Sequence, residues 1–222
     1  MQKIVITDGV AMLVEETTHD IVPVEDFRRA ISRNSVTTPL LPVGTVYYSE
    51  DSDKTVIAVI RRAEVREMNQ ANRVFTVAMP HRLYTVIMKN GGIRTVKQHF
   101  MLDLPTSMET RVYQAPFPNR TLQGDICASG VMFASQDECL VFRIDHVVNQ
   151  VERTRHNTDH ISYAKEAMPR DFREGADGQF TRMLDRWAAW TQRHEEDWQS
   201  SFSEIEWRDA GAFGDTVGGS NG

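Results

Sequence analysis

Apolar and polar residues alternate with a period of two through the middle of the chain. The alternating segments are rich in β-branched and aromatic side chains, which favour strands, and they cover residues 45–49, 55–61, 73–78, 83–88 and 93–99. Asn90, Gly91 and Gly92 separate the last two segments, and such residues accept the positive φ angles of a hairpin turn. The pattern therefore predicts an antiparallel meander at the centre of the fold.

Two later segments place apolar residues at the spacing of one helical face. The first covers residues 135–154, begins with capping signals at Ser135, and has a face made of Leu140, Ile144, Val147, Val148 and Val151. The second covers residues 180–190, extends to about residue 202, and has a stripe made of Phe180, Met183, Leu184, Trp187 and Trp190. Both are expected to be packing helices.

The two ends of the chain carry weaker patterns. Residues 4–14 form a predicted strand pair around Asp8-Gly9, a dipeptide typical of hairpin turns. Residues 23–33 begin with Pro23 and run from acidic to basic side chains, as in a short helix. The stretch from Gly211 to Gly222 is rich in glycine and has few apolar anchors, so we expect it to be mobile.

The composition is that of a globular protein. The chain has 222 residues, of which 41% are apolar and 25% charged, and its net charge is −6. An acidic chain is a poor general ligand for nucleic acid, because binding phosphates needs Lys and Arg. No apolar stretch approaches the ~20 residues that span a bilayer, and the N-terminal residues lack a secretory pattern. We therefore expect a cytoplasmic protein with reduced thiols, which binds neither membrane nor nucleic acid.

Asn119 and Cys127 are the strongest candidates for chemistry. They lie eight positions apart in the run Tyr113-Gln-Ala-Pro-Phe-Pro-Asn-Arg-Thr-Leu-Gln-Gly-Asp-Ile-Cys127. A thiol can carry an acyl group as a thioester, and a nearby amide NH2 can stabilise the oxyanion formed when that thioester is attacked. Gly124 allows the tight turn that would bring the chain back past the amide. The pair predicts an acyl-transfer site.

This run resembles the active-site flap of ubiquitin-conjugating enzymes, in which His-Pro-Asn is followed by a short turn and by Gly-x-Ile-Cys. Phe117-Pro118-Asn119 and Gly124-Asp125-Ile126-Cys127 match that pattern, except that Phe117 stands in place of the histidine. The predicted strands before the flap are similar to the meander that precedes it in the family. Within the family, the chain resembles divergent bacterial members, including protein B of the PRTRC plasmid systems.

The resemblance implies an α+β fold with an antiparallel meander and flanking helices. It divides the chain into an N-terminal strand elaboration (1–22), a ubiquitin-conjugating-enzyme-like core (23–165), a C-terminal helical extension (166–210) and a flexible tail (211–222). It also implies that a ThiF-like adenylating enzyme passes a ubiquitin-like modifier to Cys127 and that an amine then attacks the thioester. A JAB-type deconjugating peptidase is a further implied partner. The resemblance implies no cofactor for the chain itself.

Other interpretations remain open at this stage. Cys127 can be a small buried apolar residue, and Asn119 can hydrogen-bond its own backbone in a turn. Cys139 is expected in the core of the helix at 135–154. His156 and His160 have an i, i+4 spacing, but without a Cys-x-x-Cys pair we expect no metal. The alternative function is a non-catalytic adaptor of the same fold, or a structural component of a plasmid or phage system.

Overall fold

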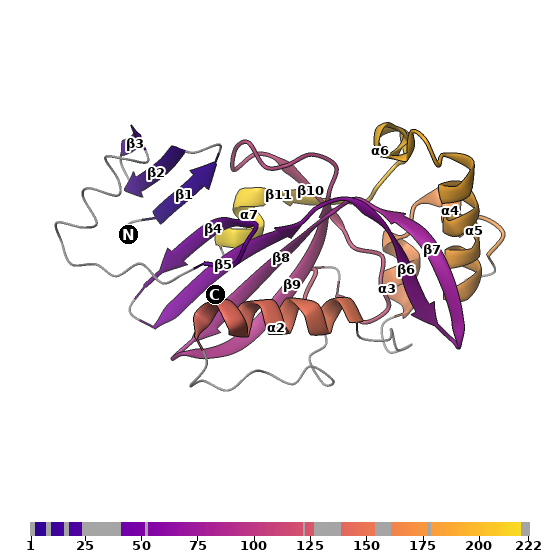
Figure 1. Ribbon diagram of the computed structural model, residues 1–222, viewed down its shortest axis with the longest axis horizontal. Coiled ribbons are helices and arrows are strands. Elements are labelled where there is room, and N and C mark those ends of the chain that lie inside the picture. The colour runs from indigo at the N-terminus through magenta and orange to yellow at the C-terminus, as the bar shows by residue number, and fades with distance from the viewer. Residues whose placement is uncertain are drawn as a thin grey trace.

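The computed structural model has a mixed α+β architecture (Figure 1). It describes residues 3–7, 10–15, 18–23, 41–51, 53–121, 123–126, 139–153, 161–176 and 179–218. A curled antiparallel sheet of nine strands forms the body of the molecule. Helices lie against it, and a two-stranded hairpin extends from one end of it.

The predicted meander is present at the centre of the sheet. Its strands are β4, β5, β8 and β9, which are neighbours in that order, and β8 and β9 are joined through Asn90 and Gly91, both at positive φ. The full order is β11-β10-β9-β8-β5-β4-β1-β2-β3. The bounds are β1 Lys3–Thr7, β2 Val10–Glu15, β3 Thr18–Pro23, β4 Thr45–Glu50, β5 Lys54–Arg61, β8 His81–Lys89, β9 Gly92–Met101, β10 Arg111–Gln114 and β11 Asp209–Ala212.

Both faces of the central strands are covered, which explains why β5 is apolar along most of its length. Ile57 and Val59 point to one face, where α2 (Leu140–Arg153) contributes Ile144, Val147, Val148 and Val151. Val56, Ala58 and Ile60 point to the other face, where α7 (Phe213–Gly218) contributes Phe213 and Val217. The helical face predicted for residues 135–154 is therefore the buried face of α2, although the described helix begins at Leu140.

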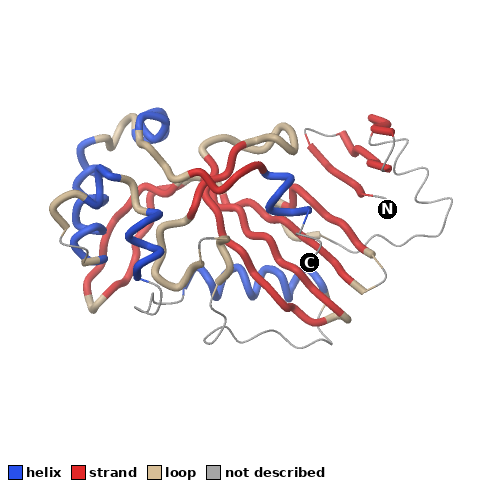
Figure 2. The backbone as a smooth tube through the Cα atoms, turned by 180° about the vertical axis from the view of Figure 1, so that it is seen from behind, coloured by secondary structure: helices blue, strands red, loops and turns tan. Residues whose placement is uncertain are grey.

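The strand predicted at 73–78 exists, but it lies outside the meander. It is part of β7 (Arg73–Met79), which pairs only with β6 (Glu64–Gln70) in the described chain. These two strands prolong β5 and β8 beyond the sheet as a hairpin, which we call the arm (Figures 1 and 2). Pro80 interrupts the ladder at the base of the arm because proline has no N–H group, and the backbone N–H of Ala63 donates instead to Nδ1 of His81 (3.1 Å).

The helices between residues 161 and 204 cover the arm. They are α3 (Ile161–Ala167), α4 (Arg170–Arg173), α5 (Phe180–Arg193), α6 (Trp198–Ser201) and a 3-10 turn at Phe202–Glu204. The predicted stripe of α5 is buried, and the hydroxyl of Thr191 accepts a 2.8 Å hydrogen bond from the backbone N–H of Ala78. The predicted extension to residue 202 is wrong, because α5 ends at Arg193 and a separate helix follows.

Two expectations for the chain ends need correction. Pro23 is the last residue of β3 and does not begin a helix, while residues 24–33 lie outside the described part of the chain. The expected mobile stretch from Gly211 contains helix α7, whose Phe213 and Val217 are buried in the core that also contains Tyr47. The strand pair at 4–14 is confirmed as β1 and β2, with Asp8 and Gly9 outside the described residues.

Candidate functional site

The segment after β10 folds back on itself as the sequence predicts. We call residues 115–126 the flap segment. Arg120 pairs with Ile126 in an antiparallel bridge, the N–H of Thr121 donates to the carbonyl of Asp125 (2.9 Å), and the N–H of Gly124 donates to the carbonyl of Thr121 (3.0 Å). Gly124 has φ of 79°, where an L side chain is strained. The turn thus places the residue after Asn119 opposite the residue before Cys127.

Strand β9 anchors the returning half of the flap segment. The N–H of Ile126 donates to the carbonyl of Val96 (2.8 Å), and the N–H of Gln98 donates to the carbonyl of Gly124 (2.9 Å). Gly124 also lies against the ring of His99, so that a Cβ atom at this position would be 2.5 Å from Nε2. The flap segment is therefore held by backbone hydrogen bonds and by close packing.

Phe117, which replaces the histidine of the family pattern, is a core residue. It is 3% exposed and lies in the aromatic cluster of the arm and its helices. Its ring centroid is 5.6 Å from that of Phe100 in an edge-to-face arrangement and 6.5 Å from that of Trp187 in a stacked one. The ring of Phe117 therefore ties the flap segment to β9 and α5 by apolar packing.

Asn119 lies at the buried side of the flap segment, with 5% of its surface exposed. Its carboxamide oxygen accepts a hydrogen bond from Nη1 of Arg120, the next residue in the chain. Because a guanidinium can only donate, the oxygen of the amide must face Arg120 and the NH2 group must point away from it. The orientation of the Asn119 amide is fixed by its neighbour.

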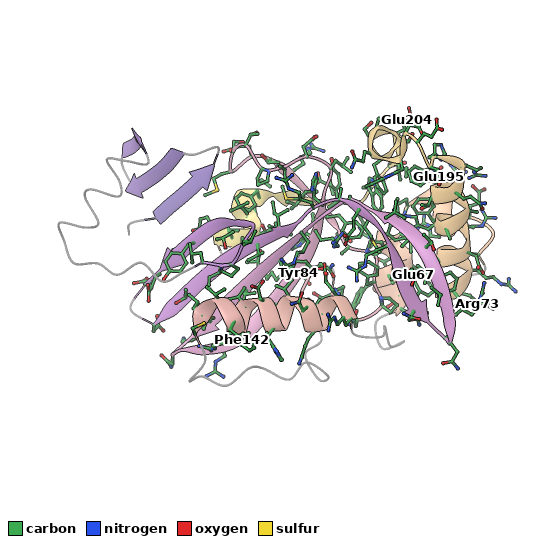
Figure 3. All side chains as sticks on the ribbon, in the orientation of Figure 1. Glu67, Arg73, Tyr84, Phe142, Glu195 and Glu204 are labelled. Atoms are coloured by element: carbon green, nitrogen blue, oxygen red, sulfur yellow. The ribbon has the colours of Figure 1, made fainter. Side chains whose placement is uncertain are left out.

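Arg120 begins a chain of buried hydrogen bonds that leads from the flap segment into the sheet. Its Nε donates to the carboxamide oxygen of Gln98 on β9 (2.8 Å), and Nε2 of Gln98 donates to the hydroxyl of Tyr84 on β8 (2.8 Å). Tyr84, which lies where the sheet meets α2 (Figure 3), donates in turn to Oε1 of Glu152 on α2 (2.9 Å). The chain connects the flap segment with the last turn of α2.

Arginines neutralise the carboxylate at the far end of this chain. Nε of Arg82 donates to Oε1 of Glu152 (2.9 Å), and Nη1 of Arg66 lies 3.2 Å from Oε2. Burial alone would raise the pKa of Glu152, but attraction to Arg82 and Arg66 and the hydrogen bonds from Arg82 and Tyr84 outweigh burial and lower it. Glu152 is therefore the ionised acceptor on which the chain ends.

Burial lowers the pKa values of two side chains beside the flap turn, those of His99 and Arg120. Burial lowers the pKa of His99 to about 4, with a smaller contribution from the charge of Lys97, so the ring is neutral near pH 7. Its Nδ1 has no hydrogen-bond partner among the described residues. Burial lowers the pKa of Arg120 to about 10, which leaves its guanidinium protonated at neutral pH.

The remaining candidates divide between described and undescribed residues. Cys127, His156 and His160 lie outside the described residues. Cys139 is exposed just before α2, and its predicted place in the core is wrong. A residue five positions before Ile144 lies about 140° away from it around a helix, off the buried stripe. The part of the chain that is described contains no group of three or more His, Cys, Asp and Glu side chains arranged to hold a metal ion.

Sequence reasoning missed the residues that hold Asn119. Arg120 looks like a surface residue of a turn. Gln98, Tyr84 and Glu152 lie on three separate elements, and 68 positions separate Tyr84 from its partner Glu152. The available signal was the placement of Tyr84 and Gln98 on strands: a polar side chain within an apolar strand needs a buried partner.

Two further findings bear on identity. None of the helices in the described ranges is long and apolar enough to cross a membrane. Comparison of the chain with family models, with curated proteins and with solved structures finds no match.

Proposed function

We propose that this chain is a conjugating enzyme for a ubiquitin-like protein, in which Cys127 carries the modifier as a thioester and Asn119 stabilises the oxyanion formed during its transfer. The bridge between Arg120 and Ile126 is the observation that carries the proposal. It brings together the neighbours of the two candidate residues, although Asn119 and Cys127 are eight positions apart in sequence.

The order of elements supports the same proposal. An antiparallel meander leads to a flap segment, and α2 follows the flap and covers one face of the sheet. This is the layout that the resemblance to ubiquitin-conjugating enzymes implies. A ThiF-like adenylating enzyme would supply the modifier, and a JAB-type peptidase would remove it from its acceptor. No cofactor bound to this chain is required, because the thioester arrives already activated.

The reaction proceeds by acyl transfer to an amine. The amine nitrogen forms a bond to the thioester carbonyl carbon, and the π electron pair moves to the oxygen. When this intermediate collapses, the C–S bond breaks with its electron pair on sulfur, and the nitrogen loses a proton to solvent. The products are an amide, the Cys127 thiolate and one proton. Positioning and stabilisation of the oxyanion are the main contributions of the protein.

The two cysteines of the chain allow a test that needs no partner protein. The acyl donor is the mercaptoethanesulfonate thioester of acetyl-Gly-Gly, which exchanges with thiols. Cys139→Ala can be acylated only at Cys127, and Cys127→Ala only at the exposed Cys139. We expect lysine to discharge Cys127 roughly 10²-fold faster than Cys139, as followed by intact mass. Equal rates from the two cysteines would overturn the proposal.

Asn119→Asp in the Cys139→Ala background separates chemistry from folding. Aspartate keeps an oxygen for Arg120 but has no NH2 group to donate. We expect Cys127 to be acylated normally and discharged roughly 10²–10³-fold more slowly. Unchanged discharge would remove Asn119 from the mechanism.

A non-catalytic adaptor is the second candidate, and the burial of Asn119 favours it. At 5% exposure, with its oxygen bound by Arg120, the amide is as well suited to holding the flap segment as to catalysis. In that case Asn119→Asp keeps the fold, and Cys127 is discharged no faster than Cys139.

A further inference from the structure

The guanidinium of Arg120 is fully buried, and no carboxylate of the described residues forms an ion pair with it. Arg120 is 2% exposed, and its partners are the amide oxygen of Gln98 and the side-chain and backbone oxygens of Asn119. In the described ranges, no carboxylate lies within ion-pair distance of it. Arg82 is also buried, but it contacts both Glu64 and Glu152.

An unneutralised buried charge is costly, and neutral amides offset only part of its desolvation. Burial lowers the pKa of Arg120, yet the side chain stays protonated at neutral pH. The positive charge therefore persists beside Asn119, and the hydrogen-bond partners of the guanidinium within the described residues are neutral oxygens of Gln98 and Asn119. Such a site is electrostatically complementary to an oxyanion, whose negative charge exists only while an acyl group is being transferred.

We infer that Arg120 is the positioning residue of the transfer reaction: it orients the Asn119 amide and supplies a buried positive charge that favours the oxyanion. The inference rests on the proposed function. Because the guanidinium donates to the amide oxygen, it fixes the direction of the NH2 group and polarises it as a donor. Arg120 acts through Asn119 and is not assigned a contact with substrate.

The hydrogen-bond chain behind Arg120 keeps it in this orientation. Arg120 can only donate, so the oxygen of Gln98 must face it and the NH2 group of Gln98 must face Tyr84. The hydroxyl of Tyr84 is then left to donate to Glu152. Each donor and acceptor in this series of hydrogen bonds is thereby assigned, from the Glu152 carboxylate on α2 to Arg120 in the flap segment.

Gln98→Glu tests the charge of Arg120 without removing the arginine. The new carboxylate faces the guanidinium and neutralises it, while the length of the side chain is unchanged. In the Cys139→Ala background, we expect normal acylation of Cys127 by the acetyl-Gly-Gly thioester and discharge by lysine roughly 10-fold slower. The matched control is Gln192→Glu, the same substitution at an exposed position of α5, which should leave discharge unchanged.

Arg120→Lys tests the orientation of the amide separately, since lysine keeps the charge but lacks the planar fork. We expect slow hydrogen exchange of the Asn119 side-chain NH2 group in the parent protein and faster exchange in Arg120→Lys, as measured by nuclear magnetic resonance. This readout does not depend on catalysis.

The outcomes separate the two proposals. If Cys127 is discharged rapidly in the parent protein and equally rapidly in folded Gln98→Glu, the role of Arg120 is refuted and the proposed function stands. If Cys127 is discharged no faster than Cys139 in the parent protein, the proposed function fails and the role of Arg120 fails with it. Unchanged NH2 exchange in Arg120→Lys would refute the orienting role alone.

Discussion

Gly124 lies so close to His99 that a single added carbon atom would not fit between them. A Cβ atom on Gly124 would be 2.5 Å from Nε2 of His99 and 2.9 Å from the carbonyl oxygen of Gln98. His99 is 2% exposed, so its ring cannot swing into solvent. The turn of the flap segment therefore depends on the absence of a side chain at Gly124.

Gly124→Ala should destabilise the protein by about 3 kcal/mol or more, because positive φ and a steric clash act together. Gly91→Ala is the matched control. Gly91 also has positive φ, 73°, but a Cβ there would meet nothing within 4 Å. It should cost only about 1 kcal/mol. Urea unfolding of both variants measures the difference. If both variants lose the same free energy of unfolding, the contact of Gly124 with His99 and Gln98 does not constrain the turn.

Protonation of His99 should make the protein less stable in acid. The pKa of His99 is about 4 in the fold and about 6.5 in the unfolded chain. The unfolded state thus binds more protons between these values, and stability falls as the pH drops from about 6.5 to about 4. Relative to His99→Gln, the parent should lose about 2–3 kcal/mol between about pH 7 and about pH 4.5.

Urea unfolding of both proteins at the two pH values measures this effect, because the other titrating groups are shared and cancel. A pH dependence that is the same in His99→Gln and in the parent would contradict the neutral, buried histidine.

Phe117→His should destabilise the protein, although it introduces the histidine found in the motif of ubiquitin-conjugating enzymes that this segment resembles. The position lies among aromatic rings, 5.6 Å from Phe100 and 6.5 Å from Trp187 between centroids. An imidazole that lacks a partner there costs roughly 1–3 kcal/mol. Phe117→Leu is the control for lost volume. In thermal and denaturant unfolding, Phe117→His should be less stable than Phe117→Leu. The opposite order of stability would reveal a polar partner for the imidazole ring.

The hydrogen bond between Thr191 and the backbone of Ala78 should be needed to hold the arm against α5. Thr191→Val leaves the buried N–H of Ala78 without its acceptor (2.8 Å in the parent), which costs roughly 1–3 kcal/mol. Thr191→Ser keeps the hydroxyl and should be nearly neutral. Unfolding in urea, together with amide exchange at Ala78, checks both expectations. Unchanged amide exchange at Ala78 in Thr191→Val would contradict the role of the hydroxyl.

Parts of the fold could be predicted from the sequence, because the interactions that determine them lie within short segments. Side-chain alternation marks β4, β5, β8 and β9, and the apolar stripe of α2 is buried as predicted. The turn at Gly124 was also predictable, since glycine relieves the strain of positive φ and the antiparallel return follows from a short loop.

Other predictions failed because they depended on contacts between distant segments. Residues 73–78 alternate like a meander strand, yet the break at Pro80 directs β7 into the arm. Glycines after Gly211 suggested mobility, but Phe213 and Val217 find a buried site on the sheet. Cys139 lies next to an apolar stripe in sequence but is off it in rotation, and it is exposed.

The sequence by itself determined the central strands β4, β5, β8 and β9 and the buried faces of α2 and α5, and it singled out Asn119, Gly124 and Cys127. Only the tertiary structure decided which way the Asn119 amide faces. That orientation depends on Arg120, and Arg120 depends on Gln98, Tyr84 and Glu152 from three other elements. Hydrophobic periodicity indicates which face of a segment is buried. The hydrogen-bond partner of a buried polar group, in contrast, comes from distant residues that folding brings together.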